Sequence, residues 1–106
     1  MQRICFLLKV KKNLLEQYKE THRNVWPEMQ QALQAAGWSN YSLFLRDDGM
    51  LVGYLETENF DQARAKLAES EVNLRWQNSM KPYFEQPEGQ RPDKGLLVLP
   101  SIFYLA

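Results

Sequence analysis

The apolar residues of this chain alternate between two spacings, and the order of those spacings limits the folds open to it. Residues 3–10 predict a strand, because apolar side chains occupy every second position. A helical stripe follows, in which the members are three or four positions apart: Leu14, Tyr18, His22, Val25, Met29, Leu33 and Ala36. The first third of the chain is therefore expected to be a strand followed by a helical region.

Local signals bound and interrupt this helical region. Asn13 is a favourable N-cap with Glu16 three residues later, and Gly37 is a favourable end. Pro27 lies inside the stripe, where proline removes a backbone hydrogen bond and clashes with the preceding turn. We expect a kink or a break over residues 24–26, with His22 in the last turn before it.

The rest of the chain contains two more strands, a second helical region and a final strand. The stretch "NYSLFLRDDGMLVGYLET" predicts a β-hairpin with Gly49 at the turn position that needs a positive φ. Asn59 is expected to cap the second helical region, which continues or restarts until Pro82. Its apolar stripe in the later part is Val72, Trp76, Met80 and Tyr83. Residues 85–95 predict a loop, and residues 96–105 a strand with Pro100 inside it.

The resulting order, βαββαβ, is typical of an α+β fold with a ferredoxin-like antiparallel sheet and both helical regions on one face. With 106 residues, the chain is expected to form a single domain that spans residues 1–106.

The predicted strands are apolar on both faces, although helices on one side can cover only one of them. In the first strand, Cys5 and Leu7 lie opposite Ile4, Phe6 and Leu8. A bare second face would leave a large apolar patch exposed. We therefore predict a homodimer in which two sheets pack face to face, with the C-terminal "IFYL" segment crossing between subunits.

Charge and cysteine content exclude several classes of function. Thirteen Lys and Arg residues balance thirteen Asp and Glu residues, so nothing in the composition favours nucleic acid or a charged membrane surface. Cys5 is the only cysteine and His22 the only histidine, which excludes an internal disulfide and a Cys/His zinc site. The first residues read as a strand and not as a signal peptide, so a soluble cytoplasmic protein is expected.

Tyr18, His22 and Trp26 follow one another at four-residue intervals and share one helix face. Two interpretations of His22 are open: a packed core histidine bound to a backbone carbonyl, or a proton carrier at a site. Tyr41 and Trp76 are equally compatible with packing. Periodicity alone therefore leaves the function open.

Four motifs give the chain a resemblance to the L-rhamnose mutarotases along nearly its whole length. They are "EQYKETHRNVWPEM", "GWSNYSLFL", "RWQNSM" and the closing "IFYL". The resemblance implies a dimeric α+β fold and an enzyme that interconverts the α and β anomers of L-rhamnose without a cofactor or metal. It also implies that His22 transfers the proton and that Tyr18, Tyr41 and Trp76 contact the sugar.

The chemistry suits these residue types. Ring opening delivers a proton to the ring oxygen and removes one from the anomeric hydroxyl, and imidazole can carry a proton either way near neutral pH. The chain departs from the family pattern at Gln77, where a second tryptophan is expected after Trp76. Gln77 is assigned to the sugar site, where it either hydrogen-bonds a hydroxyl or faces away.

Two alternatives come from other functional classes. Dimeric ferredoxin-like proteins include haem-binding and cofactor-free monooxygenases, in which His22 would be an axial ligand within an apolar pocket. A non-catalytic sugar-binding dimer is the other. Haem addition and an anomer-exchange assay distinguish all three.

Overall fold

The computed structural model describes residues 1–86 and 90–106. Within these residues, four strands form one antiparallel sheet in the order β2-β3-β1-β4. The strands are β1 (Gln2–Lys9), β2 (Ser39–Leu45), β3 (Met50–Thr57) and β4 (Leu97–Leu99). This strand order, with helices between β1 and β2 and between β3 and β4, confirms the predicted ferredoxin-like α+β fold.

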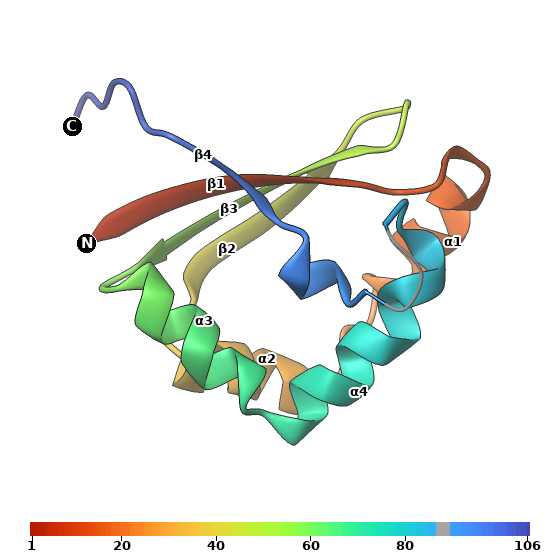
Figure 1. Cartoon of the computed structure of the whole chain (residues 1–106), viewed down its shortest axis with the longest axis horizontal. Coiled ribbons are helices and arrows are strands. Elements are labelled where there is room, and N and C mark those ends of the chain that lie inside the picture. The colour runs from red at the N-terminus through yellow and green to blue at the C-terminus, as the bar shows by residue number, and fades with distance from the viewer. Residues whose placement is uncertain (87–89) are drawn as a thin grey trace.

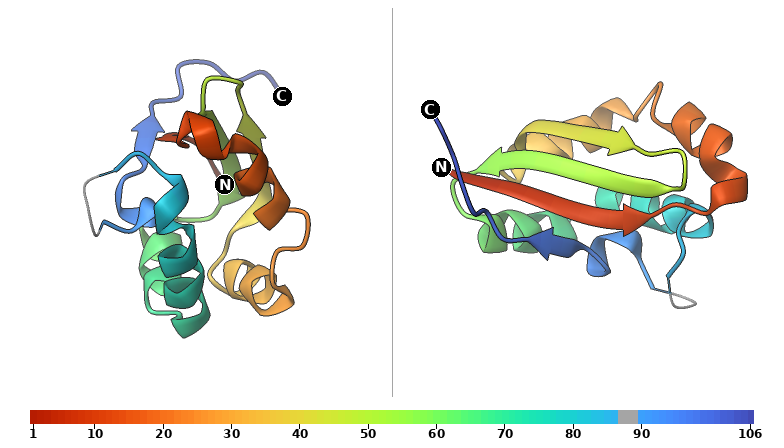
Figure 2. Two further views of the ribbon diagram at one scale, coloured as in Figure 1. Left: turned by 90° about the vertical axis from the view of Figure 1, so that its right-hand side faces the viewer. Right: turned by 90° about the horizontal axis from the view of Figure 1, so that it is seen from above.

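The helices cover one face of the sheet, which we call the inner face. The α-helices are α1 (Leu15–Thr21), α2 (Pro27–Ala35), α3 (Phe60–Ala68) and α4 (Glu71–Met80), and short 3-10 helices occur at η1 (Lys12–Leu14), η2 (Lys81–Tyr83) and η3 (Pro92–Lys94). Helices α2, α3 and α4 lie under the inner face, and α1 lies at one end of the sheet (Figure 1). The view from above in Figure 2 shows the opposite, outer face of β1, β2 and β3 free of helices.

The break predicted ahead of Pro27 is confirmed. Helix α1 ends at Thr21, and Pro27 is the first residue of α2. His22 is the C-cap of α1, so its side chain lies at the break itself. Proline is favourable at a first helical position because the N–H that it lacks has no partner there.

The predicted N-cap at Asn13 is wrong. Residues 12–14 form the 3-10 helix η1, and α1 begins at Leu15 without any side-chain cap. The backbone N–H of Leu14 donates to the carbonyl of Lys11 at 2.9 Å. This tight turn satisfies a backbone donor near the start of the helical region, which leaves Asn13 exposed in the middle of the turn.

The other helix and turn signals are confirmed. Asn59 caps α3, since its side-chain oxygen accepts from the N–H of Gln62 at 3.0 Å. The second helical region restarts at α4, where Ser70 accepts from the N–H of Asn73 at 3.2 Å. Gly49 has a φ of +99° in the β2–β3 turn.

The core lies between the inner face of the sheet and the helices. Buried residues of the sheet include Phe6, Leu8, Leu51 and Leu55, and those of the helices include Met29, Leu67, Trp76 and Met80. Gly53 permits a close approach here, because a Cβ at this position would lie 2.2 Å from the ring of Phe6.

The last strand is shorter than predicted. Strand β4 ends at Leu99, and residues 100–106 form no helix or strand, so the expected strand over residues 96–105 is wrong in its extent. Pro100 has no N–H to donate to β1, which ends the pairing. In the loop predicted over residues 85–95, residues 92–94 form η3, and residues 87–89 lie outside the described part of the chain.

Among the described residues, none of the helices has the length and hydropathy needed to cross a membrane.

Candidate active site

A cavity of about 1000 Å³ opens between the inner face of the sheet and the helices. Its lining comes mainly from β1, β2, α2, α4, η3 and the break between α1 and α2, with single residues from α1, β3 and α3. The five residues that the sequence assigned to the site all line it: Tyr18, His22, Tyr41, Trp76 and Gln77. Folding therefore brings together residues that are as much as 59 positions apart, from Tyr18 to Gln77.

His22 lies against two aromatic rings at the break between α1 and α2. Its imidazole is 4.5 Å from the ring of Tyr18 and 5.5 Å, edge to face, from the indole of Trp76. Burial lowers the pKa of His22 from its ordinary value, although a hydrogen bond with the backbone of Tyr18 opposes this shift. The neutral ring is therefore favoured at neutral pH.

The hydrogen bonds around Nδ1 of His22 define its tautomer. Nδ1 lies 2.8 Å from the hydroxyl of Thr21 and 3.3 Å from the carbonyl of Tyr18. The Thr21 hydroxyl donates its single hydrogen to the same carbonyl at 2.6 Å, so it can only accept from the imidazole. This network assigns the proton of the neutral ring to Nδ1, and no described residue donates a hydrogen bond to Nε2, which keeps its lone pair.

Two tyrosines supply neutral hydroxyl groups. Burial raises the pKa of both Tyr18 and Tyr41 well above the ordinary value of 10, and in Tyr18 the neighbouring Tyr41 adds to the effect. Both phenols therefore stay protonated at neutral pH and can donate hydrogen bonds to a ligand. Tyr41 extends from β2, with its ring 5.1 Å from that of Trp38.

Tryptophans form the apolar part of the wall. The indoles of Trp26 and Trp76 meet edge to face at a centroid distance of 5.1 Å. Trp38, immediately before β2, is buried, and its indole N–H donates to the carbonyl of Ala63 at 3.3 Å. A pocket with indole faces, phenol hydroxyls and one imidazole is suited to a small ligand that has both C–H and hydroxyl surfaces.

Comparison with known proteins identifies the family. Residues 3–105 match the sequence model of the family described as L-rhamnose mutarotase. The chain belongs to that family. An L-rhamnose mutarotase from Bacillus subtilis (strain 168) is 38% identical over 106 residues, which cover 99% of each chain. One from Listeria monocytogenes serotype 4b is 36% identical over 108 residues and matches along the full length of both chains.

One solved structure agrees with this assignment to the L-rhamnose mutarotase family, and another shares the fold. The crystal structure of an L-rhamnose mutarotase from Formosa agariphila superposes with a TM-score of 0.82, at 27% identity and with full coverage of both chains. A putative antibiotic biosynthesis monooxygenase from Nitrosomonas europaea has a TM-score of 0.62 at 17% identity, over 95% of this chain and 89% of the other. The latter similarity shows a shared fold alone.

Two tryptophans and an aspartate are among the residues that line the cavity of this mutarotase family member and that sequence reasoning missed. Trp26 shares a helix face with Tyr18 and His22, and this signal could have assigned it to the site. Trp38 lies inside the motif "GWSNYSLFL", three residues before Tyr41. Asp93 gave no signal, because it lies in a charged segment that resembles an ordinary loop.

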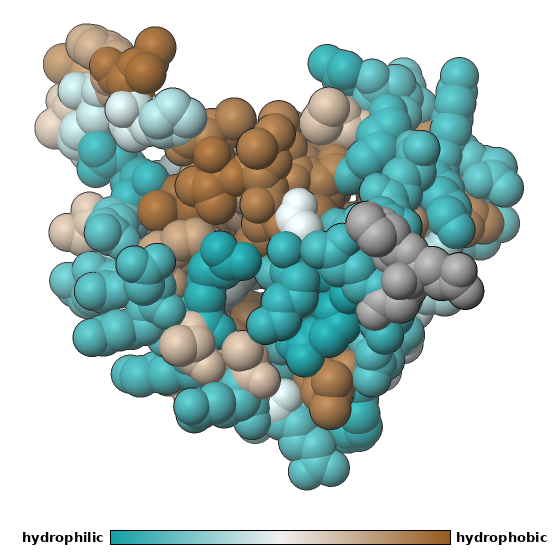
Figure 3. Space-filling model, viewed as in Figure 1, coloured by the Kyte–Doolittle hydropathy of each residue, from teal (hydrophilic) through white to brown (hydrophobic). Residues whose placement is uncertain are grey.

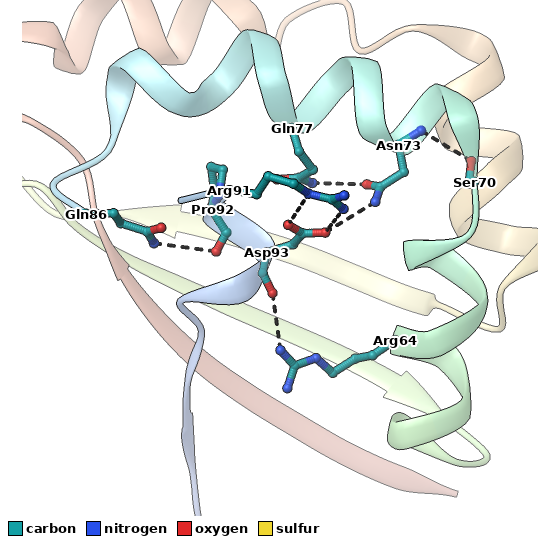
Figure 4. A network of polar contacts seen from close by, with 8 residues as sticks. All are labelled: Arg64, Ser70, Asn73, Gln77, Gln86, Arg91, Pro92 and Asp93. Carbon is teal, nitrogen blue, oxygen red and sulfur yellow. Dashed lines mark hydrogen bonds and ion pairs between the residues drawn. The ribbon is translucent and has the colours of Figure 1, made fainter. Parts of the chain in front are cut away.

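Asp93 belongs to a polar network at one side of the cavity, shown in Figure 4. Its carboxylate accepts two hydrogen bonds from Arg91, at 3.0 and 2.6 Å, and one from the side-chain amide of Asn73 at 3.3 Å. Asn73 in turn accepts a hydrogen bond from the side-chain amide of Gln77 at 3.1 Å.

Among residues 1–86 and 90–106, no group of three His, Cys, Asp or Glu side chains is placed so that it could hold a metal ion.

Proposed function

We propose that this chain interconverts the α and β anomers of L-rhamnose, the reaction for which its family is named, with His22 as the proton carrier. The observation that carries the proposal is the hydrogen bonding of His22, in which Nδ1 holds the proton and Nε2 keeps a free lone pair beside the cavity. A general base must lie within hydrogen-bond reach of the proton that it removes, and a free ring nitrogen on a residue that lines the cavity meets this requirement.

Ring opening and reclosure need one proton to leave the anomeric hydroxyl and one to reach the ring oxygen. Neutral His22 takes up the anomeric proton at Nε2, the bond between C1 and the ring oxygen breaks with its electron pair left on the ring oxygen, and the imidazolium passes the proton to that oxygen. The open aldehyde then rotates about the C1–C2 bond, the hydroxyl formed from the ring oxygen adds to its other face, and His22 moves the proton from this oxygen to the new anomeric oxygen. Because burial lowers the pKa of His22, the ring is neutral and ready to accept a proton at neutral pH, and its protonated form readily gives the proton up.

The other residues bind and orient the sugar. The neutral phenols of Tyr18 and Tyr41 donate hydrogen bonds to sugar oxygens, since both pKa values are raised. The indole of Trp76, which is buried and contacts His22 and Trp26, covers the apolar C–H side and the 6-methyl group of the ring. These roles require no metal and no cofactor.

The direct test is anomeric exchange measured by saturation-transfer NMR. Purified protein treated with a chelator should accelerate exchange between the anomeric protons of L-rhamnose well above the buffer rate. If L-rhamnose, related deoxy sugars and aldohexoses all exchange their anomers at the buffer rate, the proposed mutarotase activity is wrong. Sugar binding without exchange would indicate a binding module, and a Soret band on adding haem would indicate the haem-binding alternative.

The pH profile gives a second test. Because burial lowers the pKa of His22, the proton-accepting form persists as the pH falls to 6.5, and kcat/KM should decline only below that value. No decline is expected up to about pH 9, since the raised pKa values keep both tyrosines protonated. Buffer-corrected exchange rates from about pH 4.5 to 9 would measure the profile. A midpoint at or above 6.5, or a rate that rises in acid, would contradict the proposal.

We further propose that the active form is a homodimer joined through the outer face of the sheet. This face carries the side chains of Cys5, Leu7, Phe44, Val52 and Tyr54. Phe44 is 63% exposed, and all three residues of β4 are exposed as well. Figure 3, which views the molecule from the side of β4, shows apolar surface across the middle of the molecule and again at the C-terminal segment. A second copy covers such a patch by symmetry.

The C-terminal segment, residues 100–106, supports the same arrangement. Ile102, Phe103 and Leu105 are 93%, 79% and 80% exposed within one chain. The segment runs past the N-terminal end of β1, where Tyr104 packs on the guanidinium of Arg3 (Figure 2). Exposed apolar side chains at this density are typical of a segment that packs on a partner subunit.

A cytoplasmic location of the protein remains a prediction from the sequence.

A further inference from the structure

We propose that Asn73 and Asp93 orient the side chain of Gln77 so that its carbonyl oxygen, Oε1, accepts a hydrogen bond from a hydroxyl group of the bound sugar. Gln77 would then be a specificity-determining residue, and Asn73 and Asp93 would be positioning residues that act through it. This inference rests on the proposed function, because it concerns the sugar that the mutarotase site binds.

The orientation follows from the direction of each hydrogen bond in Figure 4. The carboxylate of Asp93, paired with Arg91 at 2.6 Å, can only accept. Asn73 must therefore turn its NH2 group toward Asp93, at 3.3 Å, which points its carbonyl oxygen at Gln77. Gln77 must then turn its own NH2 group toward Asn73, at 3.1 Å. Either amide, if flipped, would place two acceptors against each other.

The network is held in place on both sides. Asn73 is fully buried, and its neighbours in the network are at least half-buried. The backbone carbonyl of Asp93 accepts a hydrogen bond from the guanidinium of Arg64 at 3.2 Å, which ties η3 to α3. Rotation of the Gln77 amide would break its hydrogen bond to Asn73 and leave the carbonyl oxygen of a fully buried side chain without a donor, so it is disfavoured.

The carbonyl oxygen of Gln77 is free to meet a ligand. No described residue donates a hydrogen bond to it, and it is not among the described side-chain atoms that are buried without a partner. Gln77 lines the cavity, and its NH2 group is occupied by Asn73. The group that it offers is therefore an acceptor, which requires a donor such as a sugar hydroxyl.

This acceptor distinguishes the chain from the pattern in which a second indole follows Trp76. An indole face at this position would cover C–H surface, whereas Gln77 Oε1 accepts a hydrogen bond from a hydroxyl group. A site built around a sugar hydroxyl rejects an analogue without it, because the acceptor is left unpaired.

The test compares Gln77→Met and Asn73→Leu, alone and together, with Asn78→Ala as the control on the exposed side of α4. KM and kcat for anomeric exchange of L-rhamnose are measured by NMR, with the midpoint of thermal unfolding as a check on folding. Gln77→Met should raise KM about five- to tenfold with little change in kcat. Asn73→Leu should raise KM by a similar factor in the wild-type background but less than about twofold in the Gln77→Met background.

Monodeoxy analogues of L-rhamnose identify the hydroxyl group. For one of the 2-, 3- and 4-deoxy sugars, Gln77→Met and the wild type should have equal KM values. A wild-type KM for L-rhamnose in Gln77→Met, or additive effects of the two substitutions, would overturn the inference while the proposed function stands. If Asn73→Leu does not fold, Asp93→Asn replaces it as the positioning variant. A wild-type protein that does not exchange L-rhamnose anomers would overturn the proposed function and this inference with it.

Discussion

Replacing His22 with asparagine should slow anomeric exchange of L-rhamnose by about two to four orders of magnitude, the usual contribution of a positioned acid or base. The amide of asparagine can keep the donor role of Nδ1 toward the Thr21 hydroxyl and the Tyr18 carbonyl. It has no counterpart to Nε2. The break between α1 and α2 should therefore stay intact, and the measurement is the exchange rate by saturation-transfer NMR at saturating sugar.

His22→Gln is the matched variant. Its longer side chain can place an amide near the position of Nε2, but the amide does not titrate near neutral pH. Both variants should therefore lose the same activity, and both should lose the decline below pH 6.5 that the lowered pKa of His22 predicts. A His22→Asn protein that unfolds yet keeps its activity per folded molecule would instead make His22 a packing residue.

The lowered pKa of His22 also predicts how stability depends on pH. The unfolded chain binds a proton at His22 near pH 6.5, whereas the folded chain binds it only at lower pH. The contribution of His22 to stability is thus fully present above 6.5 and is lost as the pH falls through the lowered pKa. This loss should vanish in His22→Asn.

Deleting residues 100–106 should cause the proposed dimer to dissociate or the protein to aggregate. The segment carries three side chains that are at least 79% exposed in one chain, and the outer face of the sheet carries Phe44, which is 63% exposed. In the proposed dimer, removing the segment should take away part of the contact and leave the apolar outer face exposed, and not merely reduce thermal stability. Light scattering at micromolar concentration measures the outcome for the intact and shortened chains.

Two surface substitutions sharpen this prediction. Phe44→Ser removes an apolar side chain from the outer face, and Leu74→Ser removes one from α4, where Leu74 is 42% exposed. Phe44→Ser should weaken the dimer, and Leu74→Ser should leave it unchanged. A monodisperse, folded monomer of the intact chain would rule out the dimer, with no effect on the assignment to the L-rhamnose mutarotase family.

Much of the site could be predicted because its residues lie in short motifs on regular elements. The spacing of Tyr18 and His22 places both on one helix face, and the resemblance of "GWSNYSLFL" and "RWQNSM" to the mutarotases added Tyr41, Trp76 and Gln77. Their roles remain proposals, but all five line one cavity. Trp38 was missed although it lies in one of these motifs, since a buried tryptophan near a strand is usually a packing residue.

The sequence by itself determined the order of strands and helices, the break at Pro27 and the turn at Gly49, because each depends on local backbone geometry or on the period of nearby side chains. Tertiary structure decided how far the last strand pairs with β1 before Pro100 ends it, and it alone brought Asp93 to Asn73 across twenty residues. Hydrogen bonds between distant residues leave no periodic trace in a sequence, so the direction in which Gln77 presents its amide emerges only when α4 and η3 pack together.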